Sequence, residues 1–517
     1  MTGSNGAQLL LETARDLGVR ICFANPGTTE LTLVHAFDEV PEIRPVLGLF
    51  EGVCTGAADG YARVSGQVAL TLLHLGPGFA NGIANLHNAR RAHSPIINII
   101  GDHATWHLPF DAPLTSDIDS LASPVSRAVI HLRSTDTVRD DMARAFDIAT
   151  SAPGGVVTLI APTDVMDGAV TPDATVRPSS RADLTIVADE DIARCAGSIP
   201  SDRELILLLG GNALGERAIR AAGRIAEKTG ARLLMESYPR IVELGGDLPR
   251  LERLAYFPQD VLAQLGDATV VLVGARPPVS YFGYEGQPSQ LVTGDRLVSL
   301  AAETDSCADA LEALLARLPA TPAENARALP AIPPRSPELS AEEIIEELIV
   351  QLPEGAVVSL EGSTLGTPFF RQAHRAARHR VMTNTGGAIG QGLPCALGAA
   401  LGAPDARIVA LQSDGSAQYT LQSLWTMARE RLPVTIVMAT NHRYGILQTE
   451  LKRADIDLAQ PAIEKLTLIA DPRTDWTALA AGYGVEAVRV TNSAEFAAAL
   501  RRGLELAGPL LIQAELP

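Results

Sequence analysis

The 517-residue sequence lacks long apolar runs, paired cysteines and an excess of positive charge. Its longest apolar stretches, such as "TVVLVGA" and "SPIINIIG", are too short to span a bilayer. The N-terminus shows no basic start followed by an apolar run, so a secretory signal is not expected. The five cysteines form no CxxC pair, which fits a protein of the reducing cytoplasm. The net charge of −18 disfavours binding to nucleic acids and anionic membranes, both of which select basic surfaces. What remains is a globular protein with an acidic, solvated surface, which fits an enzyme among other classes.

Strand and helix patterns alternate along the chain, as in parallel sheets covered by helices. The length favours about three domains, and the pattern places them at 1–170, 186–320 and 338–517. Segments 171–185 and 318–340, the second rich in Pro and Ala, are interpreted as linkers. The predicted fold is α/β with three doubly wound parallel sheets, in which ligands bind beyond the carboxyl ends of the strands.

Two oxygen-bearing side chains follow neighbouring predicted strands in the last domain. Asp414 lies in the glycine-bearing turn "SDGS", and Asn441 comes directly after the next apolar strand. Such a turn offers N–H groups and a helix dipole to a phosphate, which an Asp would repel unless a divalent cation stood between them. Taken alone, Asp414 is better explained as a helix N-cap and Asn441 as a turn residue. Together they indicate Mg²⁺, which takes a few oxygen ligands and leaves positions for a diphosphate.

The order Asp-Gly-Ser, helix, apolar strand and Asn before "YGI" resembles the diphosphate–metal motif of thiamine-diphosphate-dependent enzymes. That motif usually reads Gly-Asp-Gly and ends in Asn-Asn; here Ser413 and Thr440 replace its first Gly and first Asn. The resemblance covers nearly the whole chain and is closest to the benzoylformate decarboxylase and acetolactate synthase large-subunit branches. Its most specific parts are "NPGTTEL" and "DGSAQYTLQSLW". It implies Mg²⁺ held by Asp414, Asn441 and the carbonyl of Arg443.

The resemblance also assigns contacts to thiamine diphosphate. Glu51 at the start of "EGVCTGAADGYAR" would bind N1′ of the aminopyrimidine and so activate C2, although a Glu at a helix start is ordinarily a dipole partner. In "TNTGGAIGQG", Gly387 would accept from the 4′-amino group and Ile389 would be the wedge between the two rings, where simple core filling is the alternative. The remaining implied cofactor contacts are Ser363, Thr364, Gly415, Ser416 and Tyr444.

Three further positions bear on the reaction. His74 in "LLHLGPG" matches an active-site histidine of the decarboxylases, and histidine is the ordinary proton carrier near neutral pH. A polar residue at a strand end is the alternative interpretation. Thr28 matches a Ser that binds the substrate carboxylate. Phe282 falls at or near a second catalytic His, which would leave the proton relay incomplete and favour attack on a second carbonyl.

The function implied is a thiamine-diphosphate- and Mg²⁺-dependent decarboxylase or carboligase that acts on a 2-oxo acid through a C2 ylide and an enamine. An acetolactate synthase or a C–C lyase of 2-hydroxy ketones is the alternative, and a non-catalytic paralogue for assembly or regulation is an alternative of another class. The family places each cofactor between two subunits, so a homodimer is the minimum unit and a homotetramer is expected. Gly210, Gly211 and Gly215 do not form G-x-G-x-x-G, so we expect no FAD in the middle domain.

Overall fold

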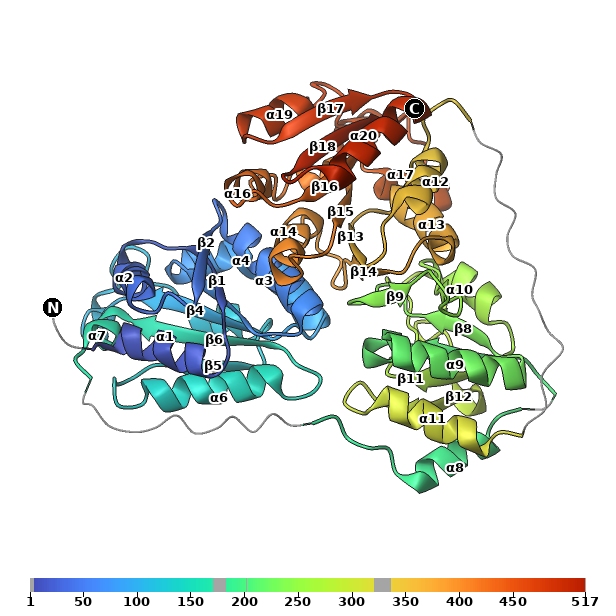
Figure 1. The fold of residues 1–517 in the computed structure, drawn as a ribbon, viewed down its shortest axis with the longest axis horizontal. Coiled ribbons are helices and arrows are strands. Elements are labelled where there is room, and N and C mark those ends of the chain that lie inside the picture. Colours follow the sequence, from blue (N-terminus) through green and yellow to red (C-terminus); the bar gives the residue numbers. More distant parts are fainter. Residues whose placement is uncertain (1–3, 171–182, 201, 320–335, 517) are drawn as a thin grey trace.

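The computed structural model describes residues 4–170, 183–200, 202–319 and 336–516, which form three lobes arranged as a triangle (Figure 1). The linker predicted at 171–185 lies almost wholly outside the described residues, and so does most of the one predicted at 318–340. In the described part of the chain, no helix is long and apolar enough to cross a bilayer.

The first lobe contains a six-stranded parallel sheet in the order β2-β1-β3-β4-β6-β5. Its strands are β1 (Ile21–Asn25), β2 (Arg44–Leu47), β3 (Ala69–Leu73), β4 (Ile96–Asp102), β5 (Ala128–His131) and β6 (Val156–Pro162). Its helices are α1 (Gly6–Asp16), α2 (Leu31–Glu39), α3 (Glu51–Ser65), α4 (Leu75–Arg91), α5 (Ile118–Ala122), α6 (Val138–Thr150) and α7 (Thr163–Asp167). Both faces of the sheet are covered, because Ile97 and Ile99 pack into one core while Ile96 and Ile100 pack into another.

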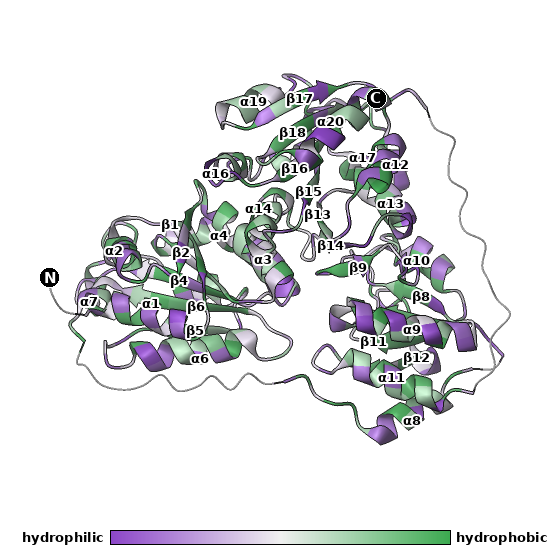
Figure 2. Cartoon of the chain, in the orientation of Figure 1, coloured by the Kyte–Doolittle hydropathy of each residue, from purple (hydrophilic) through white to green (hydrophobic). Residues whose placement is uncertain are grey.

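The middle lobe contains a five-stranded parallel sheet in the order β10-β8-β7-β11-β12. Its strands are β7 (Leu205–Leu209), β8 (Arg232–Met235), β10 (Glu252–Arg253), β11 (Thr269–Val273) and β12 (Leu297–Ala301). Its helices are α8 (Asp189–Gly197), α9 (Glu216–Thr229), α10 (Pro258–Leu265) and α11 (Cys307–Arg317). Figure 2 shows mainly hydrophobic strands, whereas outer helices such as α9 mix hydrophobic and hydrophilic residues, as expected for helices with one face in the core.

The third lobe contains a seven-stranded sheet in the order β17-β18-β16-β15-β13-β14-β9, parallel except for β9. Its strands are β9 (Val242–Leu244), β13 (Ala356–Leu360), β14 (His379–Thr383), β15 (Ile408–Ser413), β16 (Val434–Thr440), β17 (Glu486–Val490) and β18 (Leu510–Glu515). Its helices are α12 (Ala341–Gln351), α13 (Ser363–Gln372), α14 (Gly392–Gly402), α15 (Asp414–Ala417), α16 (Ser423–Arg429), α17 (Gly445–Arg453), α18 (Pro461–Thr467), α19 (Trp476–Gly482) and α20 (Ser493–Glu505). These three sheets confirm the predicted α/β fold class.

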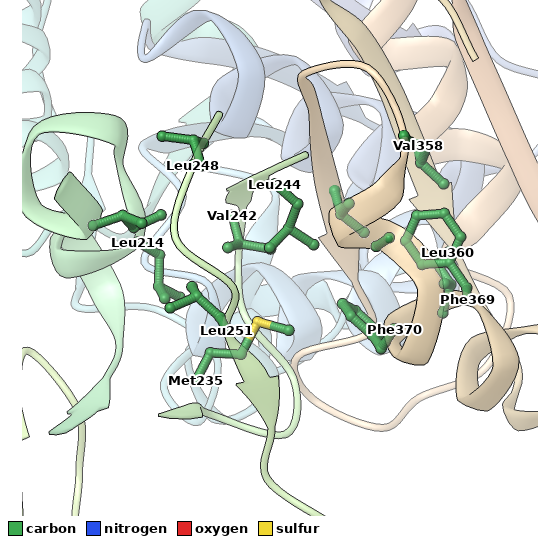
Figure 3. Packing of buried hydrophobic residues seen from close by; sticks show 14 of the residues in the cluster. Leu214, Met235, Val242, Leu244, Leu248, Leu251, Val358, Leu360, Phe369 and Phe370 are labelled. Carbon is green, nitrogen blue, oxygen red and sulfur yellow. The ribbon is translucent and has the colours of Figure 1, made fainter. Parts of the chain in front are cut away.

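Strand β9 lies within the range expected for the middle domain, yet it pairs with the sheet of the third lobe. Its buried Val242 and Leu244 belong to one continuous hydrophobic cluster, which includes Met235 of the middle lobe and Phe369 of the third (Figure 3). Because burial of this apolar surface favours contact between the lobes, the middle lobe is fixed against the third.

Helices α3 and α14 join the first lobe to the third by close packing. A Cβ at Gly60 would lie 2.1 Å from the carbonyl oxygen of Cys395, so the two helices approach as only glycine permits. Beside this contact the buried Arg63 binds Asp59 and donates to the carbonyl of Thr383 (2.7 Å) and to that of Arg240 (3.2 Å). One guanidinium therefore contacts all three lobes, and it does so next to the carboxyl edges where the candidate site lies.

Candidate active site

Asp414 begins α15 at the carboxyl end of β15 and is 2% exposed. One carboxylate oxygen accepts the N–H of Gly415 (2.9 Å) and the other accepts the N–H of His442 (2.8 Å). Burial raises the pKa of the Asp414 carboxyl, and the two N–H groups partly offset this. The hydrogen-bond donors to this buried carboxylate are two main-chain N–H groups, and the His442 ring lies 4.0 Å away, so the carboxylate is suited to a cation.

Asn441 follows the adjacent parallel strand β16, as the sequence pattern predicted. Its amide donates to the hydroxyl of Thr364 (3.4 Å), and its carbonyl oxygen accepts the N–H of Arg443 (3.2 Å). The bond between the neighbouring N–H of His442 and Asp414 ties the two loops together. The structure therefore brings Asp414, Asn441 and Thr364 to one sheet edge, beside the carbonyl of Arg443, which accepts from Gly445 (3.0 Å).

The loop "LEGST" lies against the Asp414 turn. In this loop Gly362 comes directly before Ser363 and Thr364, which begin α13. Gly362 has φ +102°, and a Cβ there would lie 2.1 Å from the hydroxyl oxygen of Ser413. The Ser413 side chain thus occupies space that a glycine on the neighbouring loop leaves free. The absence of a side chain at Gly362 explains how the turn tolerates Ser413 where the motif usually has Gly. The close contact between the two loops also keeps the start of α13, with its N–H groups, near Asp414.

Gly415 and Ser416 form the first turn of α15, and both are buried. Gly415 is required sterically, since a Cβ there would lie 2.7 Å from the ring of Tyr444. The Ser416 hydroxyl donates to the carbonyl of Ser413 (3.1 Å), which tightens the turn. The ring of Tyr444 therefore packs against the Asp414–Gly415 turn.

The C-terminal end of the loop 386–390 is held by hydrogen bonds to Glu361, a residue whose role the sequence did not reveal. The buried carboxylate of Glu361 accepts the N–H groups of Gly390 (2.7 Å), Gln391 (3.2 Å) and Gly392 (2.8 Å). Burial raises the pKa of this carboxyl against the lowering effect of the three donors. Its buried oxygens fix the backbone of the loop that carries Ile389, whose side chain is 38% exposed.

Gly387 lies in the same loop with φ +82°, and its position is covered by a tyrosine of the middle lobe. A Cβ at Gly387 would lie 1.9 Å from the hydroxyl oxygen of Tyr281. Burial raises the pKa of Tyr281, so the hydroxyl stays protonated at neutral pH. Phe282, 54% exposed, packs edge-on against Tyr281 with ring centroids 4.9 Å apart. The segment near the expected second His therefore supplies a hydroxyl as well as a phenyl ring.

Glu51 begins α3 at the carboxyl edge of the first sheet and accepts from the amide of Asn81 (3.0 Å). A Cβ at Gly78 would lie 3.0 Å from Glu51 Oε1 and 3.2 Å from His74 Cβ. Glu51 and His74 therefore flank the same glycine and lie side by side. This is the arrangement expected when a helix start and a strand end meet at one sheet edge.

His74 is oriented by a buried acid, Glu30. His74 Nδ1 lies 2.8 Å from Glu30 Oε2 and 3.3 Å from the hydroxyl of Thr29. Glu30 is completely buried, and the ring of His74 packs over Gly27, where a Cβ would lie 2.2 Å from Nδ1. Thr28 is exposed on the same short helical turn, η1 (Thr28–Glu30). The carboxylate acceptor favours a proton on Nδ1 and leaves Nε2 free for other chemistry.

Helix α4 connects the start of α3 to the loop that carries Ile389. The amide of Asn85 donates to the carbonyl of Gly52 on α3 (2.8 Å) and to that of Gly390 (3.3 Å). Asn88 donates to the carbonyl of Ala388 (2.8 Å) in the same loop as Ile389. Helix α4 thus fixes the position of the start of α3, where Glu51 lies, relative to the loop that carries Ile389.

The residues present fit a diphosphate-bearing cofactor. The donor set of Asp414, Asn441 and a main-chain carbonyl is made of hard oxygens, and two helix starts point N–H groups toward the same turn. In the described residues no cluster of three His, Cys, Asp or Glu side chains forms a metal site, and the donor set here contains only one such side chain.

Comparisons with known proteins agree with this geometry. Residues 4–122 match the thiamine pyrophosphate enzyme, N-terminal TPP binding domain, and residues 366–514 match the C-terminal TPP binding domain. The chain is 46% identical over 522 residues, 99% of each chain, to IlvX of Mycobacterium tuberculosis, which is provisionally named an acetolactate synthase large subunit. It is 28% identical to benzoylformate decarboxylase of Pseudomonas aeruginosa, with 97% of each chain covered. Its fold matches a thiamine-diphosphate-dependent 4-hydroxybenzoylformate decarboxylase of Rhodococcus jostii RHA1 with a TM-score of 0.86 at 24% identity, covering 99% of this chain and 100% of that one.

Proposed function

The chain belongs to the thiamine pyrophosphate enzyme family, and from that premise we propose that it is a Mg²⁺-dependent decarboxylase or carboligase of 2-oxo acids. The relation to acetolactate synthases and benzoylformate decarboxylases makes it a thiamine-diphosphate-dependent enzyme that acts on 2-oxo acids. The observation that carries the narrower proposal is the Glu30–His74 pair beside Glu51. It provides an oriented proton carrier next to the carboxylate assigned to activation.

Each half of the site has its own task in this proposal. Asp414, Asn441 and the Arg443 carbonyl would hold Mg²⁺, and Ser363 and Thr364 would bind the diphosphate. When bound, thiamine diphosphate supplies a carbon nucleophile and an electron sink for loss of CO₂ from a 2-oxo acid.

The other residues activate and position. Glu51 would hold a proton shared with the pyrimidine ring, which an amide in its place could not do. Ile389 would enforce a bent cofactor, and Thr28 would bind the substrate carboxylate. His74 would move a proton through Nε2, with Nδ1 fixed on Glu30.

Carboligation is supported by the aromatic wall of the middle lobe. Tyr238, Tyr256, Tyr281 and Phe282 contact one another through their rings, and Tyr281 reaches the Gly387 loop. This wall carries no histidine, and the proton donor that it brings to the Gly387 loop is the weakly acidic Tyr281 hydroxyl. Slow proton delivery from that side would favour attack on an acceptor carbonyl.

A second copy of the chain belongs to the proposal. Apolar side chains near both halves of the site are exposed in the single chain, namely Leu49 (43%), Ile389 (38%), Tyr419 (53%) and Leu447 (46%). Burial of such residues favours association. We propose a homodimer as the minimum active unit, with a homotetramer as the complete assembly.

The test is a panel of aliphatic and aromatic 2-oxo acids, with and without an acceptor aldehyde, incubated with protein, thiamine diphosphate and Mg²⁺. The proposal predicts CO₂ release that requires both additions, together with an aldehyde or a 2-hydroxy ketone. The Asp414→Ala variant serves as the matched control, because it should release none. Release of CO₂ that is independent of the cofactor, or none from any acid, would contradict the proposal.

A further inference from the structure

A cavity of about 330 Å³ lies at the junction of the first and middle lobes, and none of the residues assigned to the cofactor or the metal lines it. Its walls include His93, Arg127 and Gly155, which precede β4, β5 and β6, and Arg276, which follows β11. These are the amino ends of the strands in the first sheet. Glu51 follows the carboxyl end of β2, at the opposite edge, so the cavity is a separate site.

The cavity is strongly basic although the chain carries a net charge of −18. It is lined by Arg90, Arg91, His93, Arg127 and Arg276, and none of its lining residues is Asp or Glu. Positive charge on an acidic protein is thus concentrated around one hollow, which favours an anionic ligand there.

Part of this charge is already neutralised by Glu303, which lies outside the lining. Arg276 binds Glu303 through Nε (2.8 Å) and Nη2 (3.0 Å), and His93 Nε2 lies 3.2 Å from the same carboxylate. Burial pushes the pKa of Glu303 upward, but His93 and Arg276 outweigh it and lower the pKa to about 2. Glu303 is therefore an anion that offsets one positive charge, and Arg90, Arg91 and Arg127 remain.

The side chain of Arg127 is held by several hydrogen bonds within the first lobe, whereas that of Arg90 has a donor without a partner in the described part of the chain. Arg127 Nη1 donates to the carbonyls of Ile148 (3.0 Å), Ser151 (2.7 Å) and Gly154 (3.2 Å), which ties down the end of α6. Arg90 and Arg91 end α4, where cations complement the helix dipole. That role leaves the buried Nε of Arg90 without a hydrogen-bond partner among the described residues. A buried donor without an acceptor is unfavourable, but this Nε has almost no accessible surface. A ligand in the cavity would therefore contact the other guanidinium nitrogens of Arg90.

We propose that this cavity binds a small phosphorylated molecule of the size of a sugar phosphate or a nucleoside monophosphate, with its phosphoryl group on Arg90 and Arg91. Guanidinium groups match phosphate oxygens in charge and in planar, forked geometry. The volume lies at the low end of the range for small-molecule sites, roughly 300–1,000 Å³, which suits a small phosphorylated molecule. Because Arg91 and Arg276 come from different lobes, the ligand would also stabilise their junction.

Titration calorimetry on the full chain tests this, with thiamine diphosphate and Mg²⁺ saturating so that phosphates are kept from the active site. The probes are AMP and ribose 5-phosphate, with adenosine as the uncharged control. We expect a phosphorylated probe to bind once per chain and adenosine to bind far more weakly. AMP binding more tightly than ribose 5-phosphate would identify a nucleotide, and similar affinities would identify a sugar phosphate.

Variants locate the binding. Arg91→Glu changes an exposed residue and should leave the fold intact, and Arg90→Ala removes the second guanidinium group of the proposed phosphoryl site. Each should weaken binding by about tenfold or more. Arg133→Ala is the matched control, because Arg133 is exposed beyond the other end of β5 and should bind as wild type does. If neither phosphorylated probe binds, or if both variants bind as tightly as wild type, the proposal is wrong.

Discussion

Glu30 should act on catalysis mainly by orienting His74, and Glu30→Gln is the variant that shows it. Glu30 Oε2 accepts the N–H of Gly27 (2.7 Å) and faces His74 Nδ1 (2.8 Å), while Oε1 accepts the hydroxyl of Thr29 (2.6 Å). Glutamine has the same shape, but it lacks the charge and offers only one carbonyl oxygen. The bond that fixes the imidazole therefore changes from a charge-assisted to a neutral hydrogen bond.

The expected loss follows from that change. Charge-assisted hydrogen bonds contribute about 1.5–3 kcal/mol and neutral ones about 0.5–1.5 kcal/mol, so Glu30→Gln should lose about 1–2 kcal/mol of positioning. This equals a decrease of about 5- to 30-fold in kcat/KM. His74→Ala removes the proton carrier itself and should cost about 10²–10⁴-fold.

The double variant decides the matter. If Glu30 works only by orienting His74, then Glu30→Gln adds nothing to His74→Ala, and the double variant equals the single histidine variant. Steady-state kinetics with the preferred 2-oxo acid measure this, and thermal unfolding verifies the fold. Glu42→Gln, an exposed acid on the same lobe, is the matched control and should leave kcat/KM unchanged. Fully multiplicative losses in the double variant would refute the reasoning.

Three further predictions concern the other parts of the site. Asp414→Ala should keep the fold but lose Mg²⁺-dependent binding of thiamine diphosphate by calorimetry, since the diphosphate charge is then uncompensated; unchanged affinity would remove Asp414 from the metal site. Phe282→His should shift products from 2-hydroxy ketone toward free aldehyde in the presence of excess acceptor, because it places a proton donor beside Tyr281; an unchanged ratio by chromatography would disprove the role of the aromatic wall. Gly362→Ala should abolish cofactor binding, since its Cβ would lie 2.1 Å from the Ser413 hydroxyl oxygen, and Ser413→Gly should restore part of it. The restoration is only partial because Gly362 also has φ +102°, and no restoration at all would contradict the steric explanation.

The sequence predicted those parts of the site that depend on local order along the chain. Asp414 and Asn441 follow adjacent parallel strands, and Glu51 begins a helix at a strand end, so the topology alone brings each to a sheet edge. The three-sheet fold was predictable for the same reason, because each sheet is built from alternating strands and helices.

Long-range contacts were beyond such reasoning. Glu30 lies in the recognised "NPGTTEL" segment, but its bond to His74 exists only because β1 and β3 are neighbours in the sheet. Tyr281 reaches Gly387 through the packing of two lobes, and β9 joins a sheet of a different lobe from its chain neighbours. The fit between Gly362 and Ser413 likewise depends on two loops far apart in the sequence. In each case the residue or strand that makes the contact is far away in the sequence, and tertiary packing brings the two together, so a local sequence pattern does not predict the contact.

Hydrogen–deuterium exchange at C2 of bound thiamine diphosphate tests the central claim most directly, because it reports activation of the cofactor without any assumption about the substrate. Wild type with Mg²⁺ should exchange this proton far faster than free cofactor does. Glu51→Gln should bind the cofactor with similar affinity and yet exchange slowly, since an amide cannot share the proton that activates the ring. Exchange as fast in Glu51→Gln as in wild type, or no acceleration in wild type, would contradict the account.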